Sequence, residues 1–403
     1  MTKHRHVPTF ISRKLKQLRN QKNLSQNSLA EVSLVSVASI KNIESGRTKR
    51  PDEITIKRLC KFFDIEPSEL LEEHISTNYH LKCLSEKLLS EQQKIYGPSI
   101  SEALPLGNLI TSWVNYDFCG SRRYEEDNLR ARLEDVEIAL PDDFLNIRRK
   151  VIEENDRKKQ EGQKYFFNGP SLSLHKINTS CTEDGEESAI LDLRFKKSQY
   201  ANNVVAKSTY GEPLRLGALS KFNYLDQPIE FLSSGVGVCV LLFTNGGEYV
   251  VLTRRSVQEQ FRSLEYDVSL VEGIHPKKDL KNGIVDIYGA TVRGYKEELN
   301  LDIKKEDIYL FGIGNDLMYY QWNVLGCAEI DLSWEDVAKL WHGAKNRTES
   351  EKVFGIKATP EALFSFCRDN KVWSSGMAAI YYSFLSRGYN PIDLAKVCAK
   401  VFG

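Results

Sequence analysis

The stretch LSQNSLAEVSLVSVASIKNIESG, residues 24–46, predicts two short helices joined by a tight turn. Ser25 can cap the first helix, because a serine oxygen accepts hydrogen bonds from the free N–H groups at a helix start. Leu29 and Val32 lie three residues apart, so both would face a core from one side of the helix. The first helix is therefore expected over SQNSLAEV.

The second helix of the pair should begin after Ser36, which offers the same kind of cap. Ile40 and Ile43 repeat the spacing of three and would face the same core. Gly46 ends the helix, because glycine readily takes the left-handed conformation that closes helices. The two helices together form a compact pair.

Helical spacing continues on both sides of this pair. Upstream, apolar residues recur at helical intervals at Ile11, Leu15 and Leu18. Downstream, two more helices are expected, one from Ile54 to Phe63 and one around Pro67 to Leu71. Five short helices with a tight turn between the second and third predict an all-α helix-turn-helix domain over residues 1–75.

The first domain also closely resembles the repressor-type (Cro/C1, XRE) family of helix-turn-helix proteins. The matching positions are Leu24-Ser25-Gln26, Leu29-Ala30, Val35-Ser36, Ile40, Ile43-Glu44 and Gly46. Leu34 departs from the family, because a turn glycine usually stands there. The resemblance implies binding to double-stranded DNA as a homodimer on a palindromic site.

In that family the third helix enters the major groove, where Asn and Gln can pair with adenine and small apolar groups can meet a thymine methyl. Basic residues after the helix are better placed for phosphate. The DNA-binding residues that the resemblance implies are Gln26, Ser36, Val37, Ala38, Ser39, Lys41, Asn42, Arg47 and Lys49. A helix-turn-helix used only for protein contacts is the alternative.

The charge distribution agrees with a polyanion partner for this end of the chain. The 403 residues have a formal net charge of zero, yet residues 1–63 hold 14 Lys and Arg against 4 Asp and Glu, a local charge of +10. A basic end on a neutral protein favours DNA, although a solvated basic face would look the same. Eight scattered cysteines without a CxxC pair, and no apolar run of membrane-spanning length, predict a cytoplasmic protein with reduced thiols and no membrane contact.

The middle of the chain is less regular. Residues 76–134 are expected to form a helical connector, and a long helix should start at Pro141. Two β-rich runs around Asn245-Gly246-Gly247 predict a β-hairpin. Its second strand ends in Arg254 and Arg255, where a diphosphate could be held.

Residues 289–303, GATVRGYKEELNLDI, predict an amphipathic helix. Asp286, Arg293 and Glu297 share one face, and Glu298 is about 100° further round. Two adjacent glutamates one turn after an arginine suit a divalent cation, with the arginine orienting a carboxylate. A surface helix with a simple Arg293–Glu297 ion pair is the alternative.

A strand hairpin, the loop VEGIHPKKD and this helix resemble the Nudix hydrolases, whose box is Gx5Ex7REUxEExGU. The residues that match are Arg293, Tyr295, Glu297, Glu298 and Leu301, with Asp286 in place of the first glutamate. Gly294 stands where the box has the glutamate of its Arg-Glu pair, and Asn300 stands at its late glycine. The loop before Arg293 is also longer than in the box.

These departures resemble the atypical Nudix proteins that hydrolyse UDP-glucose and related UDP-sugars. The motifs shared with that group are Gly273-x-His275-Pro276, Asn300-Leu301, Ala139-Leu140-Pro141, Arg148-Arg149, Asn168-Gly169-Pro170 and Leu174-His175. The resemblance covers about residues 135 to 390. It implies a Nudix-like nucleotide-binding domain over 135–403, an α/β/α sandwich with a mixed sheet.

The resemblance also implies roles for single residues. Catalytic residues would be Arg293, Glu297 and Glu298. Mg²⁺ or Mn²⁺ would be held by Asp286, Glu297, Glu298 and Glu351. A nucleotide would be bound by Arg254, Arg255, Gly273 and His275. Gly294 removes a carboxylate that would otherwise converge on the metal, which weakens the expectation of catalysis more than that of binding.

The sequence therefore predicts a DNA-binding transcription regulator whose second domain senses a nucleotide, with a UDP-sugar as the candidate. The alternative is a working magnesium-dependent hydrolase that cleaves a nucleoside diphosphate sugar to UMP and a sugar 1-phosphate. A third reading makes the second domain a platform for protein contacts.

Overall fold

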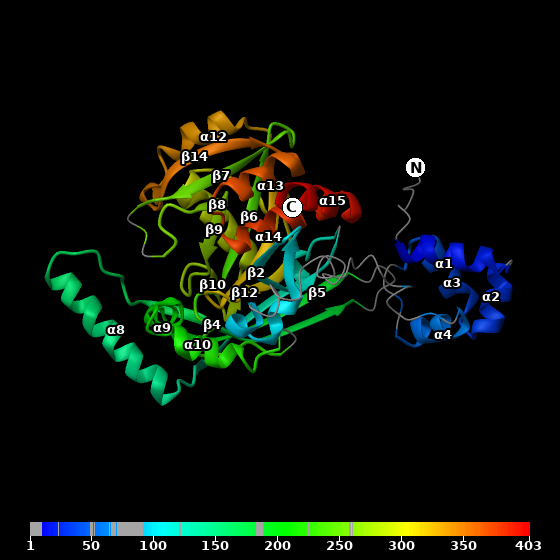
Figure 1. The fold of residues 1–403 in the computed structure, drawn as a ribbon, viewed down its shortest axis with the longest axis horizontal. Helices are drawn as coiled ribbons and strands as arrows, with labels where there is room; N and C mark the ends of the chain where they lie inside the picture. The colour runs from blue at the N-terminus through cyan, green and yellow to red at the C-terminus, as the bar shows by residue number, and fades with distance from the viewer. Residues whose placement is uncertain are drawn as a thin grey trace. The chain divides into compact units, whose positions relative to one another are not determined.

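The computed structural model describes residues 10–403 except 23, 49–50, 52, 64, 66–69, 71–91, 121, 183–187, 224–225, 258 and 260. The chain divides into two compact units, Met1–Tyr79 with Ser180–Ala189 and His80–Thr179 with Ile190–Gly403. Figure 1 shows a small helical unit and a larger one built on β-strands. None of the described helices is both long enough and apolar enough to cross a membrane.

The first unit consists of short helices, as predicted. They are α1 (Phe10–Gln21), α2 (Gln26–Ser33), α3 (Val37–Glu44) and α4 (Glu53–Phe63). Ser25 caps α2 by accepting a hydrogen bond from the N–H of Ser28, and Ser36 caps α3 by accepting one from Ser39. Most of the fifth helix expected around residues 67–71 lies outside the described residues.

The core of this unit forms where the helix faces meet. It contains Ile11, Leu15, Leu29, Ala30, Val35, Ile40, Ile43, Ile56, Leu59, Cys60, Phe63 and Leu70. The expected inward position of Val32 is wrong, because its side chain is 49% exposed. The inward face of α2 instead includes Ser33, whose hydroxyl donates to the Leu29 carbonyl at 2.6 Å and is thereby satisfied inside the core.

The turn between α2 and α3 is closed by Leu34 in the left-handed conformation, with φ 57° and ψ 30°. A side chain in this conformation costs on the order of 1 kcal/mol, because Cβ approaches the following carbonyl. The Leu34 carbonyl accepts a hydrogen bond from Arg58 Nη1 at 2.7 Å, which ties the turn to α4. The turn therefore keeps its geometry without glycine.

The second unit mixes strands and helices. Its strands are β1 (Ala103–Leu106), β2 (Leu109–Phe118), β3 (Leu129–Glu137), β4 (Pro170–Cys181), β5 (Ala189–Gln199), β6 (Gly237–Thr244), β7 (Tyr249–Arg255), β8 (Tyr266–Val268), β9 (Leu270–Gly273), β10 (Leu280–Lys281), β11 (Ile284–Val285), β12 (Ile308–Asp316), β13 (Gln321–Glu329) and β14 (Ser350–Lys357). Its α-helices are α8 (Asp142–Gln160), α9 (Tyr200–Lys207), α10 (Glu212–Leu219), α11 (Ile287–Gly294), α12 (Trp334–Trp341), α13 (Pro360–Asp369), α14 (Ser374–Ser386) and α15 (Pro391–Phe402). Short 3₁₀ turns cover Pro98–Glu102, Glu126–Asn128, Lys305–Asp307 and Arg347–Glu349, and a π-helical turn covers Tyr295–Leu299.

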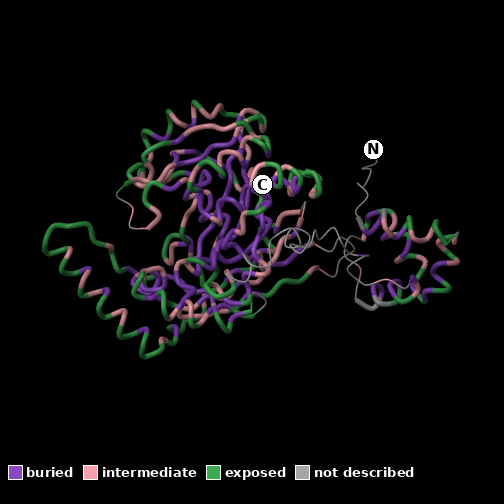
Figure 2. The backbone as a smooth tube through the Cα atoms, in the orientation of Figure 1, coloured by how far each residue is buried: buried purple, intermediate pink, exposed green. Residues whose placement is uncertain are grey.

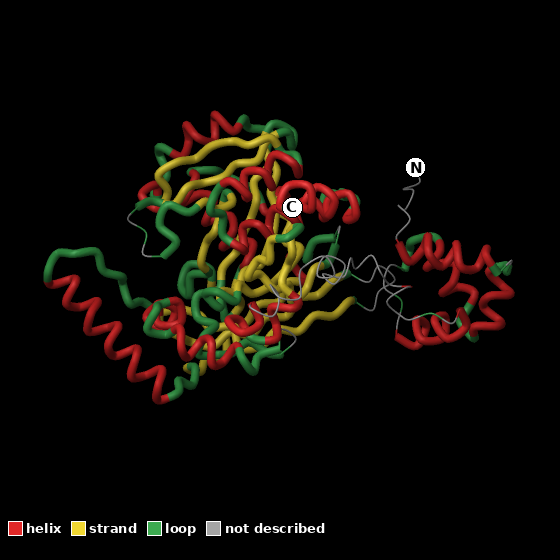
Figure 3. Tube along the Cα trace, in the orientation of Figure 1, coloured by secondary structure: helices red, strands yellow, loops and turns green. Residues whose placement is uncertain are grey.

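These strands form two sheets. The larger has the order β1-β2-β12-β13-β6-β7-β14, with β8 paired to β7 and β9 to β6, and the smaller has the order β10-β11-β3-β5-β4. The larger sheet is mixed, because β13 pairs with β6 in parallel and with β12 antiparallel. Figure 3 shows the strands surrounded by helices. The predicted mixed sheet is thus present, but the α/β region contains two sheets.

The core of the second unit follows the central strands of the larger sheet. All eight residues of β6 are buried, so both faces of this strand are covered. Both α11 and α14 pack on it. Figure 2 shows how burial varies across this unit: the central strands are buried, whereas α8 is largely exposed. A strand buried on both faces reads as a continuous apolar run, which is what GVCVLLFT is.

The helical connector predicted over residues 76–134 is wrong where the structure describes that segment. Residues 103–118 form β1 and β2, and residues 129–137 form β3. β2 lies between β1 and β12 in the larger sheet, and it pairs with β12 from Phe118 opposite Gly312 to Trp113 opposite Asp316. The segment belongs to the α/β unit because all of β1 and the four consecutive residues 111–114 of β2, which include Trp113, are buried there.

Two other local predictions are confirmed. The helix expected from Pro141 is α8, with Pro141 at its N-cap and Phe144 and Val151 buried. The hairpin expected at Asn245-Gly246-Gly247 joins β6 to β7, and all three of these residues have positive φ angles. None of the seven described cysteines is part of a disulfide.

Candidate functional site

The exposed side of α3 forms the candidate site of the first unit. Ala38 and Lys41 are exposed, and Asn42 is partly exposed, as expected for groups that meet a partner. Val37, which was also expected outside, packs partly against the core. Its inward position follows from the cap at Ser36, which fixes where the first turn of the helix faces.

Several predicted contact residues are engaged within the unit. The hydroxyls of Ser36 and Ser39 lie 2.8 Å apart and hydrogen-bond each other. The amide of Gln26 donates to Glu44 Oε2 at 2.7 Å. Arg47 is exposed, and Lys49 lies outside the described residues.

The buried ion pair between Arg19 and Glu44 holds these elements together. Arg19 Nε donates to Glu44 Oε1 at 2.6 Å and Nη2 donates to Oε2 at 3.0 Å. A third donor, Nη1, reaches the Leu24 carbonyl at 2.7 Å. The side-chain hydrogen bond that Arg19 donates to Glu44 raises the pKa of Arg19, against the opposing effect of burial. One guanidinium thus joins α1, the start of α2 and the end of α3.

A basic groove of about 580 Å³ lies beside α3. Its lining residues are Lys16, Arg19, Gln26, Lys41, Asn42, Glu44, Ser45 and Arg47. Within the described part of the chain, no ion pair is made by Lys16, Lys41 or Arg47. The sequence reasoning missed Lys16, although its place on the polar face of α1 was visible.

The second candidate site lies around α11 and the π-helical turn, where Arg293 is the central group. Its Nε and Nη2 donate to the two oxygens of Asp279 at 2.8 and 2.7 Å. Nη1 donates to Glu272 at 2.9 Å and to Glu297 at 3.1 Å, and Nη2 also reaches the Gly273 carbonyl at 2.9 Å. Arg293 thus holds three carboxylates in place, of which the sequence predicted only Glu297.

Gly294 is required because β9 lies against it. A Cβ at this position would lie 2.9 Å from Cβ and Cγ of Glu272 and 2.8 Å from Leu270 Cδ1. Carbon atoms do not approach so closely without displacement. Gly294 has no side chain, and the side chain of Glu272 occupies the space beside it. Glu272 belongs to β9, well before this helix in the sequence.

Glu297 and Glu298 are adjacent in the π-helical turn, but their side chains have different surroundings. Burial raises the pKa of Glu298 well above its usual value, and the nearby carboxylates of Glu272 and Glu349 raise it further. Glu298 Oε1 is buried without a hydrogen-bond partner. The pKa of Glu349 is raised to about 7, first by burial and then by Glu272 and Glu259. The structure thus groups three glutamates, Glu272, Glu298 and Glu349, of which only Glu298 was predicted.

Glu297 is bound to cations. Lys278 Nζ lies 2.8 Å and Lys345 Nζ 3.1 Å from Glu297 Oε1, in addition to the contact with Arg293. Burial alone would raise the pKa of Glu297, but these hydrogen bonds outweigh it and lower the pKa to about 2. A metal at Glu297 would have to displace them.

The metal-ligand set expected from the sequence is not assembled. Asp286 caps α11 by accepting from the Gly289 N–H at 2.6 Å and pairs with Lys305 at 2.8 Å. Glu351 pairs with Arg254 at 2.8 Å. Among the described residues, no group of three or more His, Cys, Asp or Glu side chains is arranged to hold a metal ion. Asp286 stands at the helix start, where its oxygen satisfies the backbone.

The other residues expected to bind a nucleotide are also engaged. Arg255 pairs with Glu259 at 2.8 Å and lies 3.5 Å from Asp267. His275 Nδ1 accepts hydrogen bonds from the main-chain N–H groups of Lys277 and Lys278, at 3.1 and 3.2 Å. His275 therefore shapes the loop that carries Asp279 to Arg293.

Comparison with known proteins bears on the first unit. Residues 15–70 match the helix-turn-helix family. Residues 15–70 are a helix-turn-helix domain. Together with the basic groove beside α3, the match supports a DNA-binding regulator. No curated protein sequence matches the chain.

Several solved structures are similar to parts of the chain. The restriction-modification controller protein C.AhdI from Aeromonas hydrophila is 32% identical, with a TM-score of 0.15, over 15% of this chain and 92% of that one. DR0079 from Deinococcus radiodurans is 16% identical, with a TM-score of 0.28, over 38% of this chain and 82% of that one. A MutT/nudix family protein from Enterococcus faecalis is 15% identical, with a TM-score of 0.21, over 39% of this chain and 55% of that one.

Replacing Gly294 tests the close approach of β9. Gly294→Ala should lower the free energy of unfolding of the second unit by roughly 1–3 kcal/mol, because the methyl group overpacks against Glu272 and Leu270. The control is Gly217→Ala in α10, where an added Cβ meets nothing within 4 Å, so only the gain in helix propensity remains. Tryptophan fluorescence in a urea titration reports the second unit, since all five tryptophans lie after residue 80. Equal stability of the two variants would contradict the contact.

The ion pairs of Glu297 predict a pH dependence. Because the pKa is lowered to about 2 in the folded protein, Glu297 contributes stability above its unfolded value, and this contribution is lost as pH falls toward 2. Glu297→Gln should therefore lower the free energy of unfolding at pH 7, and the gap to the wild type should shrink between roughly pH 5 and pH 3. Urea titrations at several pH values measure the gap. Glu335→Gln, at an exposed glutamate of α12, is the control, and a gap that stays constant down to pH 3 would refute the assignment.

Proposed function

We propose that this chain is a sequence-specific DNA-binding transcription regulator. The observation that carries the proposal is the capped helix α3, whose exposed groups lie in a basic groove within a helix-turn-helix domain. Lys16, Lys41 and Arg47 make no ion pair within the described residues, so their charges are available to a polyanion. Phosphate contacts of this kind position a protein on DNA.

The base contacts would come from α3. Asn42 can pair with the N6 and N7 edge of an adenine, and the methyl group of Ala38 can meet a thymine methyl. Gln26 is less available, because it donates to Glu44. Ser36 and Ser39 can still accept or donate one bond each while Ser36 caps the helix. A homodimer would read two half-sites about one helical turn apart.

Selection from a randomised DNA library with the purified full chain should recover a palindromic site. Asn42→Ala should bind that site more weakly by about 1–3 kcal/mol and relax the preference at one base pair. Arg47→Ala should weaken binding to all sequences and reduce the salt dependence by about one counterion. Lys61→Ala, at an exposed lysine of α4 outside the groove, is the control. A wild-type protein that selects no sequence would refute the proposal.

We further propose that the second unit binds a nucleotide, with a UDP-sugar as the candidate, near Arg293 and the three glutamates. Glu298 supports this proposal, because its buried Oε1 lacks a partner and a cation would supply one. Mg²⁺ would draw on Glu298 together with Glu272 and Glu349, rather than on Asp286, Glu297 and Glu351, and these three side chains would have to move toward the ion, because they are not arranged around a metal site. Bound Mg²⁺ would neutralise a diphosphate. Such a ligand regulates DNA binding only if it binds two states of the protein with different affinity.

The same glutamates support a second candidate, hydrolysis of a nucleoside diphosphate sugar to UMP and a sugar 1-phosphate. A carboxyl group with a raised pKa can act as a general base for water near neutral pH. The Glu349 carboxyl, with its pKa raised to about 7, has this property. The sensor and the enzyme differ only in whether the bound nucleotide is cleaved.

Incubation of the full chain with Mg²⁺ and nucleoside diphosphate sugars separates the two candidates. A rise in melting temperature without product is the expected result, and Glu298→Gln should abolish it. Glu351→Gln, at the partner of Arg254, is the control and should keep the shift. Product that Glu298→Gln abolishes would replace the sensor by the hydrolase. Neither shift nor product would refute nucleotide binding and leave a platform for protein contacts.

A further inference from the structure

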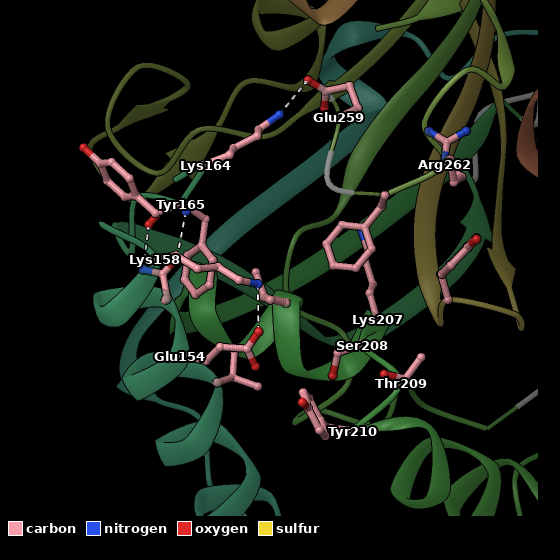
Figure 4. Close-up of a pocket in the computed structure, with 16 residues that line it drawn as sticks. Glu154, Lys158, Lys164, Tyr165, Lys207, Ser208, Thr209, Tyr210, Glu259 and Arg262 are labelled. Carbon is pink, nitrogen blue, oxygen red and sulfur yellow. Dashed lines mark hydrogen bonds and ion pairs between the residues drawn. The ribbon is translucent and has the colours of Figure 1, made fainter. Parts of the chain in front are cut away.

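A cavity in the α/β unit lies between α8, α9 and the loop after β7, and has a volume of about 580 Å³. Figure 4 shows its side chains, which are Val151, Glu154, Asn155, Lys158, Lys164, Tyr165, Phe166, Val204, Lys207, Ser208, Thr209, Tyr210, Glu259, Phe261, Arg262 and Tyr319. None of the residues from 272 to 299 lines it. The volume is in the range of small-molecule sites, roughly 300–1,000 Å³.

Lys207 is the cation of this cavity that lacks a counter-charge. Lys158 pairs with Glu154 at 2.8 Å, and Arg262 makes two bonds to Asp267 at 2.6 and 3.0 Å. In the described part of the chain, the Lys207 amine makes no hydrogen bond and no ion pair. Figure 4 likewise draws no interaction at this side chain. Lys207 is partly exposed and lines the cavity without an acceptor for its amine, so the cavity favours a ligand that supplies one.

The surroundings of Lys207 make its charge sensitive to a ligand. Burial, together with the charges of Arg262 and Arg255 and against the opposing charge of Asp316, lowers the pKa of Lys207 to about 7. The other titratable groups that face the cavity are Glu154, Lys158, Lys164, Tyr165, Tyr210, Glu259 and Tyr319. An anion beside the amine would favour its protonated form. Binding of an anion should therefore take up a proton near neutral pH.

Aromatic side chains form the walls of the cavity. They are Tyr165, Phe166, Tyr210, Phe261 and Tyr319. Tyr165 and Tyr210 are exposed, so they can close on a planar group that enters. Arg262 is fixed over the Trp373 ring at 3.8 Å, which keeps one wall rigid. Aromatic rings favour a flat apolar partner, because they bury its faces at little cost in side-chain entropy.

We propose that this cavity binds an anionic small molecule with a planar apolar part, whose negative group pairs with Lys207 Nζ. The planar part lies between the aromatic walls. Lys164, whose partner Glu259 is 3.9 Å away, can turn toward a second negative oxygen. The negative group can be a carboxylate or a phosphate, and both are acceptors for an ammonium. This inference does not depend on DNA binding or on a nucleotide at Arg293.

Calorimetry on the full chain without DNA or Mg²⁺ tests the proposal with three probes. They are 2-naphthoate, uridine 5′-monophosphate and inorganic phosphate. The first two combine a planar part with a carboxylate or a phosphate, and the third lacks the planar part. One or both of the planar probes should bind, and inorganic phosphate should bind more weakly. If inorganic phosphate bound as strongly as the planar probes, the proposed role of the aromatic walls would be overturned.

Lys207→Met removes the charge and keeps the length of the side chain. It should weaken binding of the planar probe at least about tenfold, the lower range for loss of a charged hydrogen bond. Lys150→Met, at an exposed lysine of α8 outside the cavity, should bind as the wild type does. Binding of 2-naphthoate should also weaken between pH 6.5 and 8.5, where the carboxylate keeps its charge and the Lys207 amine loses its proton. Equal binding by Lys207→Met, or no binding of any probe to the wild type, would overturn the proposal.

A measurement on the wild type covers the case in which Lys207→Met does not fold. Acetylation by acetic anhydride, read out at each lysine by mass spectrometry, should modify Lys207, and a saturating planar probe should protect it. Lys150 should be modified equally with and without the probe. Modification of Lys207 that no probe reduces would overturn the assignment of the amine to the ligand.

Discussion

The guanidinium of Arg293 is the interaction on which the second candidate site depends. It binds the carboxylates of Asp279, Glu272 and Glu297 and the Gly273 carbonyl at distances between 2.7 and 3.1 Å. These partners come from β9, from the loop after it and from the helix itself. A planar group with five donors can hold several oxygens at once, whereas a lysine in its place would offer a single compact charge. The path of the loop 273–279 follows from this one side chain.

The close approach of β9 to α11 explains why a glycine stands at the end of this helix, just before the two glutamates of the π-helical turn. Gly294 leaves room for Glu272, which reaches the site from the strand and lies beside Glu298. The helix thus gives up a side chain, and the neighbouring strand supplies the carboxylate. Glu298 also lies near Glu349, while Glu297 pairs with Lys278 and Lys345. Two adjacent glutamates consequently have opposite environments, one with its pKa raised and one with its pKa lowered to about 2.

In the helix-turn-helix domain, too, an arginine and its carboxylate partner hold neighbouring elements in place. Arg19 and Glu44 are buried partners that connect three helices, and Gln26 adds a bond to the same carboxylate. A pair of this kind fixes the orientation of α3 more than it adds net stability, because both charges were removed from water. Because the orientation of α3 is fixed, the accessible residues Lys41, Asn42 and Arg47 are held in fixed positions relative to one another. In both units an arginine fixes the geometry, and the residues left free carry the proposed binding.

The sequence by itself determined the local features. Serine caps, apolar spacing and the glycine-containing hairpin depend on neighbours within a few residues, so α2, α3, α8 and the β6–β7 hairpin could be predicted. The helix-turn-helix domain and its exposed Ala38 and Lys41 followed from the same patterns. What only the tertiary structure decided depends on residues distant in the chain. Glu272 beside Gly294, β2 inside the larger sheet, the capping role of Asp286 and the unpaired Lys207 all result from long-range packing, which short-range spacing does not encode.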